Sequence, residues 1–303
     1  MDFREFQNKI KNEIPEYLLD INIKSIDINK VNKNNGVYLT GLIILEQDSN
    51  VSPTIYLDSH YNKYQSGEVE FEDVIKDIAS EYRQARGSNV IKSVTLELDF
   101  DDVIAKLVNY EKNKDMLANA PHKRINDLAV TYRNMISNDS NGIASYLITN
   151  DIANRYNISE EALDEKAIQN MKEKQGLIIK PLGEVLSGAF PDARDMDGGL
   201  YVMTNKNGIN GATTLLYGKE ELSALSEKLK SDLIILPSSI HEVLILPKDD
   251  AMDVNELKAM VEEINSFAVS EMDFLSDNIY MFDGKTKEIE QLTGLDRGND
   301  LER

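Results

Sequence analysis

Polar turns that contain Asn, Gly, Pro or Ser recur along this sequence, and each separates two short runs rich in aliphatic and aromatic residues. Asn and Gly tolerate the positive φ angles of tight turns, so these paired runs predict β-hairpins. A segment with helical spacing of apolar residues follows each pair. We expect hairpins over about Ile21–Leu45, Asp127–Asn150, Leu200–Tyr217 and Asp232–Pro247.

Apolar residues three and four positions apart indicate the helices between these hairpins. Asp2 can cap a first helix that ends before Pro15. Ser159 can cap another helix, after a turn that begins at Asn157. Further helices are expected near Ile55 and over Val69–Arg86, Lys219–Leu229 and Val254–Phe267.

Hairpins that alternate with helices predict an α+β fold, because a doubly wound parallel sheet would show single strands between helices. We expect antiparallel sheets made of repeated hairpin-plus-helix units, with the helices packed on one face. The segment "LANAPHK" interrupts the pattern. It suggests an N-terminal domain over residues 1–118, a C-terminal domain over 119–292, and a polar tail over 293–303.

The composition excludes several classes of function. The net charge of −20, from 53 acidic and 33 basic residues, opposes direct binding to nucleic acids or anionic membranes. Cysteine is absent from the sequence, which excludes disulfides, thiolate metal sites and cysteine nucleophiles. No apolar run approaches the roughly 20 residues that span a bilayer, and the N-terminus lacks the apolar core of a secretory signal. We therefore expect a cytoplasmic protein.

The segment "LPSSIHEVLILP" places His241 beside a serine-containing turn, which raises the question of an active site. "HEVLI" lacks the second histidine of a zinc protease motif, and Ser238 and Ser239 lack the G-x-S-x-G surroundings of a hydrolase nucleophile. Strand alternation predicts that His241 shares a face with Val243 and Ile245 in a central hairpin. We interpret it as a structural histidine that needs a hydrogen-bond partner. No catalytic residue is assigned, and His241 is the candidate retained.

A locally basic spot stands out in this acidic chain, at His122, Lys123 and Arg124. We expect an exposed turn there. These three residues are the candidate binding residues, for an anion or an acidic segment of a partner. The simpler alternative is a solvated loop.

Acidic residues cluster in "LELDFDD" and in "PDARDMDGG". Hard cations bind where a few carboxylate oxygens converge, so Asp99, Asp101 and Asp102 are metal candidates. The second cluster fails the EF-hand pattern, because the sixth position counted from Asp195 is Leu200 where Gly is required. Ordinary loop composition explains both clusters, and no metal site is assigned.

Nucleotide-binding motifs do not occur in the sequence. "KNGING" has two glycines but no Lys-Ser or Lys-Thr after them, and it opens an expected strand, whereas a phosphate-binding loop opens a helix. The G-x-G-x-x-G fingerprint of dinucleotide-binding folds is also missing. We expect no cofactor.

Five segments of the sequence carry a family resemblance: "SPTIYLDSHYNKYQSG", "APHKRINDLAVTYRNMI", "ASYLITNDIANRYNIS", "YVMTNKNGINGATTLLY" and "LPSSIHEVLILP". They resemble an uncharacterised family, domain of unknown function 5688, found in Clostridia and related Firmicutes with members on mobile elements. The resemblance runs from about Phe3 to Leu292. The C-terminal half is also similar to a second uncharacterised bacillar family. Neither resemblance implies an activity or catalytic residues.

These features favour a non-enzymatic cytoplasmic protein that binds an unidentified protein partner, and the resemblance adds a role as an accessory factor of a mobile element. Two alternatives stay open. The first is a hydrolase whose site assembles from distant residues, an aspartate of "LELDFDD" with His122 or His241. The second is an acidic mimic of nucleic acid that blocks a basic partner.

Overall fold

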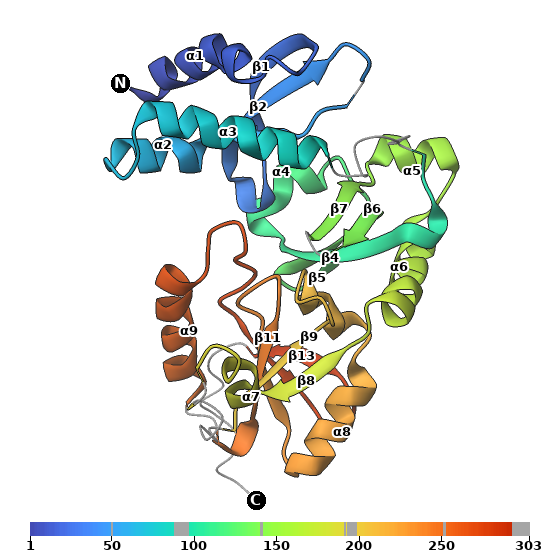
Figure 1. Cartoon of the computed structure of the whole chain (residues 1–303). Coiled ribbons are helices and arrows are strands. Elements are labelled where there is room, and N and C mark those ends of the chain that lie inside the picture. Colours follow the sequence, from blue (N-terminus) through green and yellow to red (C-terminus); the bar gives the residue numbers. More distant parts are fainter. Residues whose placement is uncertain are drawn as a thin grey trace, which may run out of the picture. The chain divides into compact units, whose positions relative to one another are not determined.

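The computed structural model describes residues 1–49, 51–87, 97–139, 142–190, 192, 199–250 and 253–292. The chain divides into two compact units, Met1–Glu97 and Leu98–Arg303 (Figure 1). The sequence suggested a boundary at residue 118, but the division falls before strand β4 (Val103–Asn109). The reason is that β4 pairs along its whole length with β6 (Leu128–Asp139), so both strands belong to the second unit.

The first unit is a three-stranded antiparallel sheet with helices packed against it. Its strands, in the order β1-β2-β3, are Ile23–Asn32, Tyr38–Glu46 and Thr54–Tyr56. Its helices are α1 (Phe3–Glu13), α2 (Leu57–Gln65) and α3 (Phe71–Arg86). Together they bury one apolar core, whose largest members include Phe6, Ile10, Leu42, Ile44, Ile75, Ile78 and Tyr82.

Two local signals of the sequence are confirmed in this unit. Asp2 caps α1, because its carboxylate accepts from the Glu5 N–H (2.8 Å) and the Glu5 carboxylate accepts in return from the Asp2 N–H (3.0 Å). The turn between β1 and β2 holds Asn35 at φ 60° and Gly36 at φ 70°, the left-handed conformation that these residues tolerate best.

A four-stranded antiparallel sheet begins the second unit. Strand β6 is central: β4 pairs with one edge, and β5 (His122–Ile125) and β7 (Gly142–Leu147) share the other. The helices here are α4 (Lys114–Leu117), α5 (Asn150–Tyr156) and α6 (Glu160–Lys174), and α6 packs against β4. As predicted, Ser159 caps α6, accepting from the Ala162 N–H (3.2 Å).

A six-stranded sheet completes the second unit, in the order β13-β12-β10-β11-β9-β8 with every pair antiparallel. The strands β8 to β13 are Ile178–Pro181, Tyr201–Thr204, Leu233–Leu236, Val243–Pro247, Ile279–Phe282 and Ile289–Leu292. The helices around it are α7 (Leu182–Leu186), α8 (Lys219–Leu229) and α9 (Val254–Ala268). The hairpin β10–β11 is central in the sheet, as predicted.

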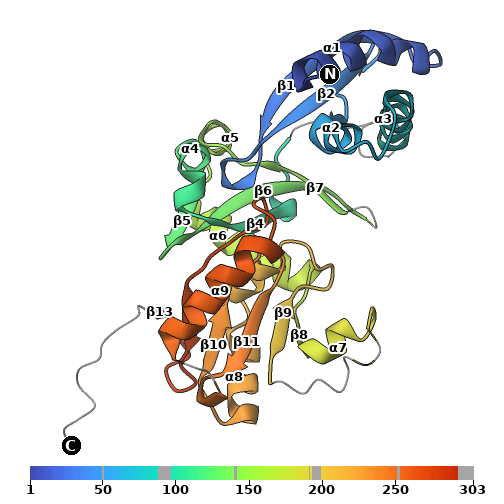
Figure 2. The same cartoon turned by 90° about the vertical axis from the view of Figure 1, so that its left-hand side faces the viewer.

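Helices cover both faces of this sheet, where we expected one. Strand β10 is buried on both sides: Leu233 and Ile235 pack in the core that contains α8, and Ile234 and Leu236 pack against α9. Figure 1 shows α8 and α9 on opposite sides of the strands, and Figure 2 shows α9 lying across β10 and β11. The α8 side of the sheet shares one continuous core with the four-stranded sheet.

Two expected elements are corrected. The run "INGATTLLY" is not a strand but a 3₁₀ helix, η7 (Gly211–Leu216), stabilised where the hydroxyls of Thr213 and Thr214 donate to carbonyls three residues earlier (2.7 and 2.6 Å). The chain after the turn at Asp283, for which no strand was expected, forms strand β13 and pairs with β12. Residues 293–303, the expected tail, lie outside the described residues.

The α+β class with antiparallel sheets is confirmed. None of the helices in the described ranges combines the length and apolarity needed to cross a membrane.

Buried tyrosines should make the stability of this fold depend on pH in the alkaline range. Burial raises the pKa of Tyr217, whose hydroxyl donates to the Gly176 carbonyl (2.9 Å), to about 12. Burial also raises the pKa of three other tyrosines still further above the usual value, those of Tyr82, Tyr132 and Tyr280. The folded protein therefore keeps protons that the unfolded chain loses above about pH 10.

We predict that the melting temperature falls steeply as the pH rises above about 10, because the unfolded chain then binds fewer protons than the folded one. Thermal unfolding followed by circular dichroism between pH 8 and 11 checks this. Tyr217→Phe should make the alkaline fall shallower, and the change of an exposed ring, Tyr38→Phe, serves as the control. A melting temperature equally pH-dependent in Tyr217→Phe and the unchanged protein would contradict the prediction.

Candidate functional site

His241 lies in the connection between β10 and β11 rather than in the strand where we expected it. Its side chain is 33% exposed. Its Nδ1 accepts from the backbone N–H of Asn210 (3.3 Å), so its Nε2 carries the proton and donates to Asp273 Oδ1 (3.2 Å). Both ring nitrogens thus have partners, one on each side.

These contacts supply the hydrogen-bond partners that His241 was expected to need, and its interpretation as a structural histidine stays a prediction. A general base needs a ring nitrogen facing its nucleophile, and here each nitrogen already holds a hydrogen bond. The nearby Ser239 is buried, and its Oγ accepts from the His241 backbone N–H (3.0 Å). His241 therefore joins the segment before η7 to the segment before β12.

The three candidate binding residues lie in strand β5, not in the exposed turn that we expected, and their side chains have separate partners. His122 Nδ1 lies 2.9 Å from the Ala120 carbonyl oxygen. The Arg124 guanidinium lies 3.9 Å from the centroid of the Tyr110 ring, in a cation–π contact. Lys123 alternates to the other face of the strand, where it lines a pocket.

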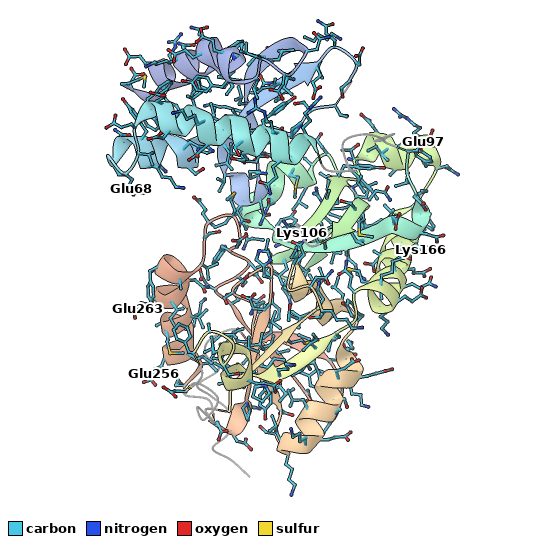
Figure 3. All side chains as sticks on the ribbon, viewed as in Figure 1. Glu68, Glu97, Lys106, Lys166, Glu256 and Glu263 are labelled. Carbon is cyan, nitrogen blue, oxygen red and sulfur yellow. The ribbon has the colours of Figure 1, made fainter. Side chains whose placement is uncertain are left out.

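The three metal candidates lie near the N-terminus of β4, and each of their carboxylates has a hydrogen-bond or ion-pair partner. Asp99 caps the 3₁₀ helix η4 (Phe100–Asp102). Asp101 and Asp102 form ion pairs with two lysines of α6, Lys166 (2.6 Å, labelled in Figure 3) and Lys174 (3.0 Å). The contact with Lys166 lowers the pKa of the Asp101 carboxyl.

Among the residues that the structure describes, no three His, Asp or Glu side chains are grouped so that they could hold a metal ion. Two acids of the second cluster, Asp195 and Asp197, lie outside those residues.

A pocket of about 280 Å³ opens where the four-stranded and six-stranded sheets meet. Its apolar lining comes from β4, β5, β6, α6, η7 and β13, and consists of Leu107, Ile125, Leu128, Ile168, Leu215, Leu216 and Ile289. Its polar lining consists of Lys123, Asp164, Lys219, Tyr280 and Glu288. Seven aliphatic side chains beside a few charged groups are the usual composition of a site for a small organic molecule.

Two ion pairs stand in the lining of this pocket. Lys123 Nζ lies 2.7 Å from Asp164 Oδ2, and Asp164 Oδ1 also accepts from the Tyr132 hydroxyl (3.1 Å). Lys219 Nζ lies 2.9 Å from Glu288 Oε2. Of these residues, Lys123 alone was predicted as a binding residue, because the other members come from segments that only the tertiary fold brings together.

Asp127 fixes one wall of the pocket. It lies in the turn between β5 and β6, and its Oδ2 accepts from Ser276 Oγ (2.6 Å) and from Asn278 Nδ2 (2.9 Å). Its Oδ1 accepts from the hydroxyl of Tyr280, the strand β12 residue that lines the pocket. Burial, and then the hydrogen bond to this carboxylate, raise the pKa of Tyr280. One carboxylate thus joins the two sheets beside the pocket.

We predict that Asp127→Ala lowers the free energy of unfolding by about 2–4 kcal/mol, because three donors in strand β12 or just before it lose their acceptor. Asp127→Asn keeps an acceptor oxygen and should cost less. The measurement is urea unfolding at neutral pH. Asp115→Ala removes a carboxylate from the exposed surface of the same unit and should change the free energy by less than about 0.5 kcal/mol. Equal unfolding midpoints for Asp127→Ala and Asp115→Ala would refute the role of Asp127.

Comparisons with known proteins place the chain in a family without supplying an activity. No curated protein and no solved structure matches it. The model described as "Family of unknown function (DUF5688)" matches residues 3–284, which include nearly all of both units. The chain therefore belongs to DUF5688, a family of unknown function.

Proposed function

We propose that this protein is a non-enzymatic binding protein, and that the pocket between the sheets of its second unit holds a small aliphatic molecule with an anionic end. The observation that carries this proposal is the lining itself, seven aliphatic side chains beside two lysines. The volume of about 280 Å³ lies just below the usual range of ligand pockets, roughly 300–1,000 Å³. A short alkyl chain suits it better than a nucleotide.

An anionic end group fits the hydrogen-bonding capacity of the lining. Each lysine ammonium carries three donors, and its ion pair uses one, so a ligand carboxylate can accept from the same ammonium. The Asp164 carboxylate, in contrast, already accepts from Lys123 and from Tyr132. Glu288 is 61% exposed, so it can turn towards solvent when a ligand binds to Lys219.

The ion-pair partners of the aspartate and histidine side chains favour a binding protein over a hydrolase. Catalytic partners must come within hydrogen-bond distance of each other. Asp101 and Asp102 pair with lysines of α6, and His241 pairs with Asp273. These contacts supply no link between the "LELDFDD" aspartates and a histidine.

The proposal also includes the cellular setting expected from the sequence. This setting is a cytoplasmic location, with a protein partner and a role as an accessory factor of a mobile element. The net charge of −20 supports a protein or small-molecule partner over a nucleic acid.

We predict that decanoate binds to the protein saturably in isothermal titration calorimetry, with one site per chain. Leu216→Asp should weaken this binding about tenfold or more, since it replaces an apolar contact of the alkyl chain with a charged carboxylate. The double variant Lys123→Ala/Lys219→Ala should weaken decanoate binding about tenfold, because it removes both ammonium groups. The same double variant should leave the binding of decanol, which has no charge, nearly unchanged.

Lys228→Ala is the matched control, because it removes an exposed ammonium from the same helix as Lys219. Circular dichroism establishes that each variant is folded. The proposal fails if neither decanoate nor decanol binds to the unchanged protein. It also fails if the Leu216→Asp variant binds both molecules as tightly as the unchanged protein does.

A further inference from the structure

Helix α9 carries apolar side chains that are buried against the sheet and, next to them, others that are exposed. Leu257 and Val261 are buried against the six-stranded sheet. Met260, Ile264 and Phe267 are 37%, 42% and 75% exposed. Their spacing of four and three residues aligns them on one face of the helix, and we call these three residues the α9 stripe.

The α9 stripe extends the apolar side of the helix beyond the residues that the sheet buries. In a helix that covers a sheet, the residues at the solvent-exposed edge of the apolar side are ordinarily polar. Single exposed apolar residues are common, but three aligned ones that include a largely exposed Phe indicate an interaction surface.

Two carboxylates accompany the stripe. Glu256 and Glu263 are seven residues apart and exposed, so they align with each other along α9. Helical geometry, at about 100° per residue, places both within about 60° of Met260. Figure 3 shows them on the side of α9 that faces away from the sheet. Lys258 is the basic residue of α9. Its Nζ lies 4.0 Å from Oε1 of Glu262, one turn further along the helix, which is the longest distance counted as an ion pair.

We propose that the α9 stripe docks a basic amphipathic helix of a partner protein. Apolar residues of that helix would cover Met260, Ile264 and Phe267, and its Lys or Arg side chains would lie beside Glu256 and Glu263. Opposite charges at the edge of an apolar contact favour the correct partner and speed its association. A second copy of this chain fits less well, since it would bring the same carboxylates and a net charge of −20.

The test uses two synthetic peptides with the same leucine face, one with lysines and one with glutamates on its polar face. We expect the Leu/Lys peptide to bind to the full chain in fluorescence anisotropy, and the Leu/Glu peptide to bind at least about tenfold more weakly. Ile264→Asp/Phe267→Asp should abolish the binding of the Leu/Lys peptide. Glu256→Lys/Glu263→Lys should weaken it about tenfold.

The control for charge is Glu220→Lys/Glu227→Lys, which makes the same change at the same spacing on the exposed face of α8. This control should alter the affinity for the Leu/Lys peptide less than about twofold. If the peptide were held only by the overall negative charge of the protein, both double variants would weaken its binding equally. An equal response would overturn the proposal. So would equal binding of the two peptides, or a dimer in sedimentation velocity that Ile264→Asp/Phe267→Asp dissociates.

Discussion

The carboxylate of Asp127 joins segments of the second unit that lie about 150 residues apart in the sequence, and the arrangement of its two sheets depends on that junction. Its side chain accepts from three donors in β12 or just before it. Its backbone carbonyl accepts from the Tyr110 N–H (2.8 Å), which follows β4. Asn109, at the end of β4, adds a buried hydrogen bond to the Leu275 carbonyl (2.9 Å). A charged acceptor with several donors stabilises such a contact more than a neutral pair does, and leaving those donors without it is costly.

The pocket lies beside this junction and takes its lining from both sheets. Strand β5 contributes Lys123 and Ile125, and strand β12 contributes Tyr280, whose hydroxyl Asp127 holds. A ligand that binds only when these walls are assembled stabilises the folded state by mass action, so ligand affinity and sheet association are linked. The α9 stripe lies on the opposite face of the six-stranded sheet, where a separate core of Ile234, Leu236 and Ile279 supports the helix. The two surfaces can therefore be altered independently by mutation.

Elements determined by local chemistry could be predicted from the sequence. The hairpin around Asn35 and Gly36 follows from their tolerance of positive φ, and the central position of β10–β11 follows from aliphatic residues on both faces. The segment at η7 was assigned wrongly, since a short apolar run does not reveal that Thr213 and Thr214 bond to the backbone. For the site, Lys123 and the need of His241 for a partner could be recognised. Their partners could not, because those contacts join residues 41 and 32 positions apart that only tertiary packing brings together.

Binding in the pocket can be examined at atomic detail in a crystal structure of the protein grown with decanoate. Electron density for the alkyl chain is expected between Leu107, Leu216 and Ile289. A carboxylate oxygen is expected within about 2.7–2.9 Å of Nζ in Lys123 or Lys219. Decanoate bound at another surface, or a pocket that holds only water at a saturating concentration of decanoate, would show that this pocket is not the binding site.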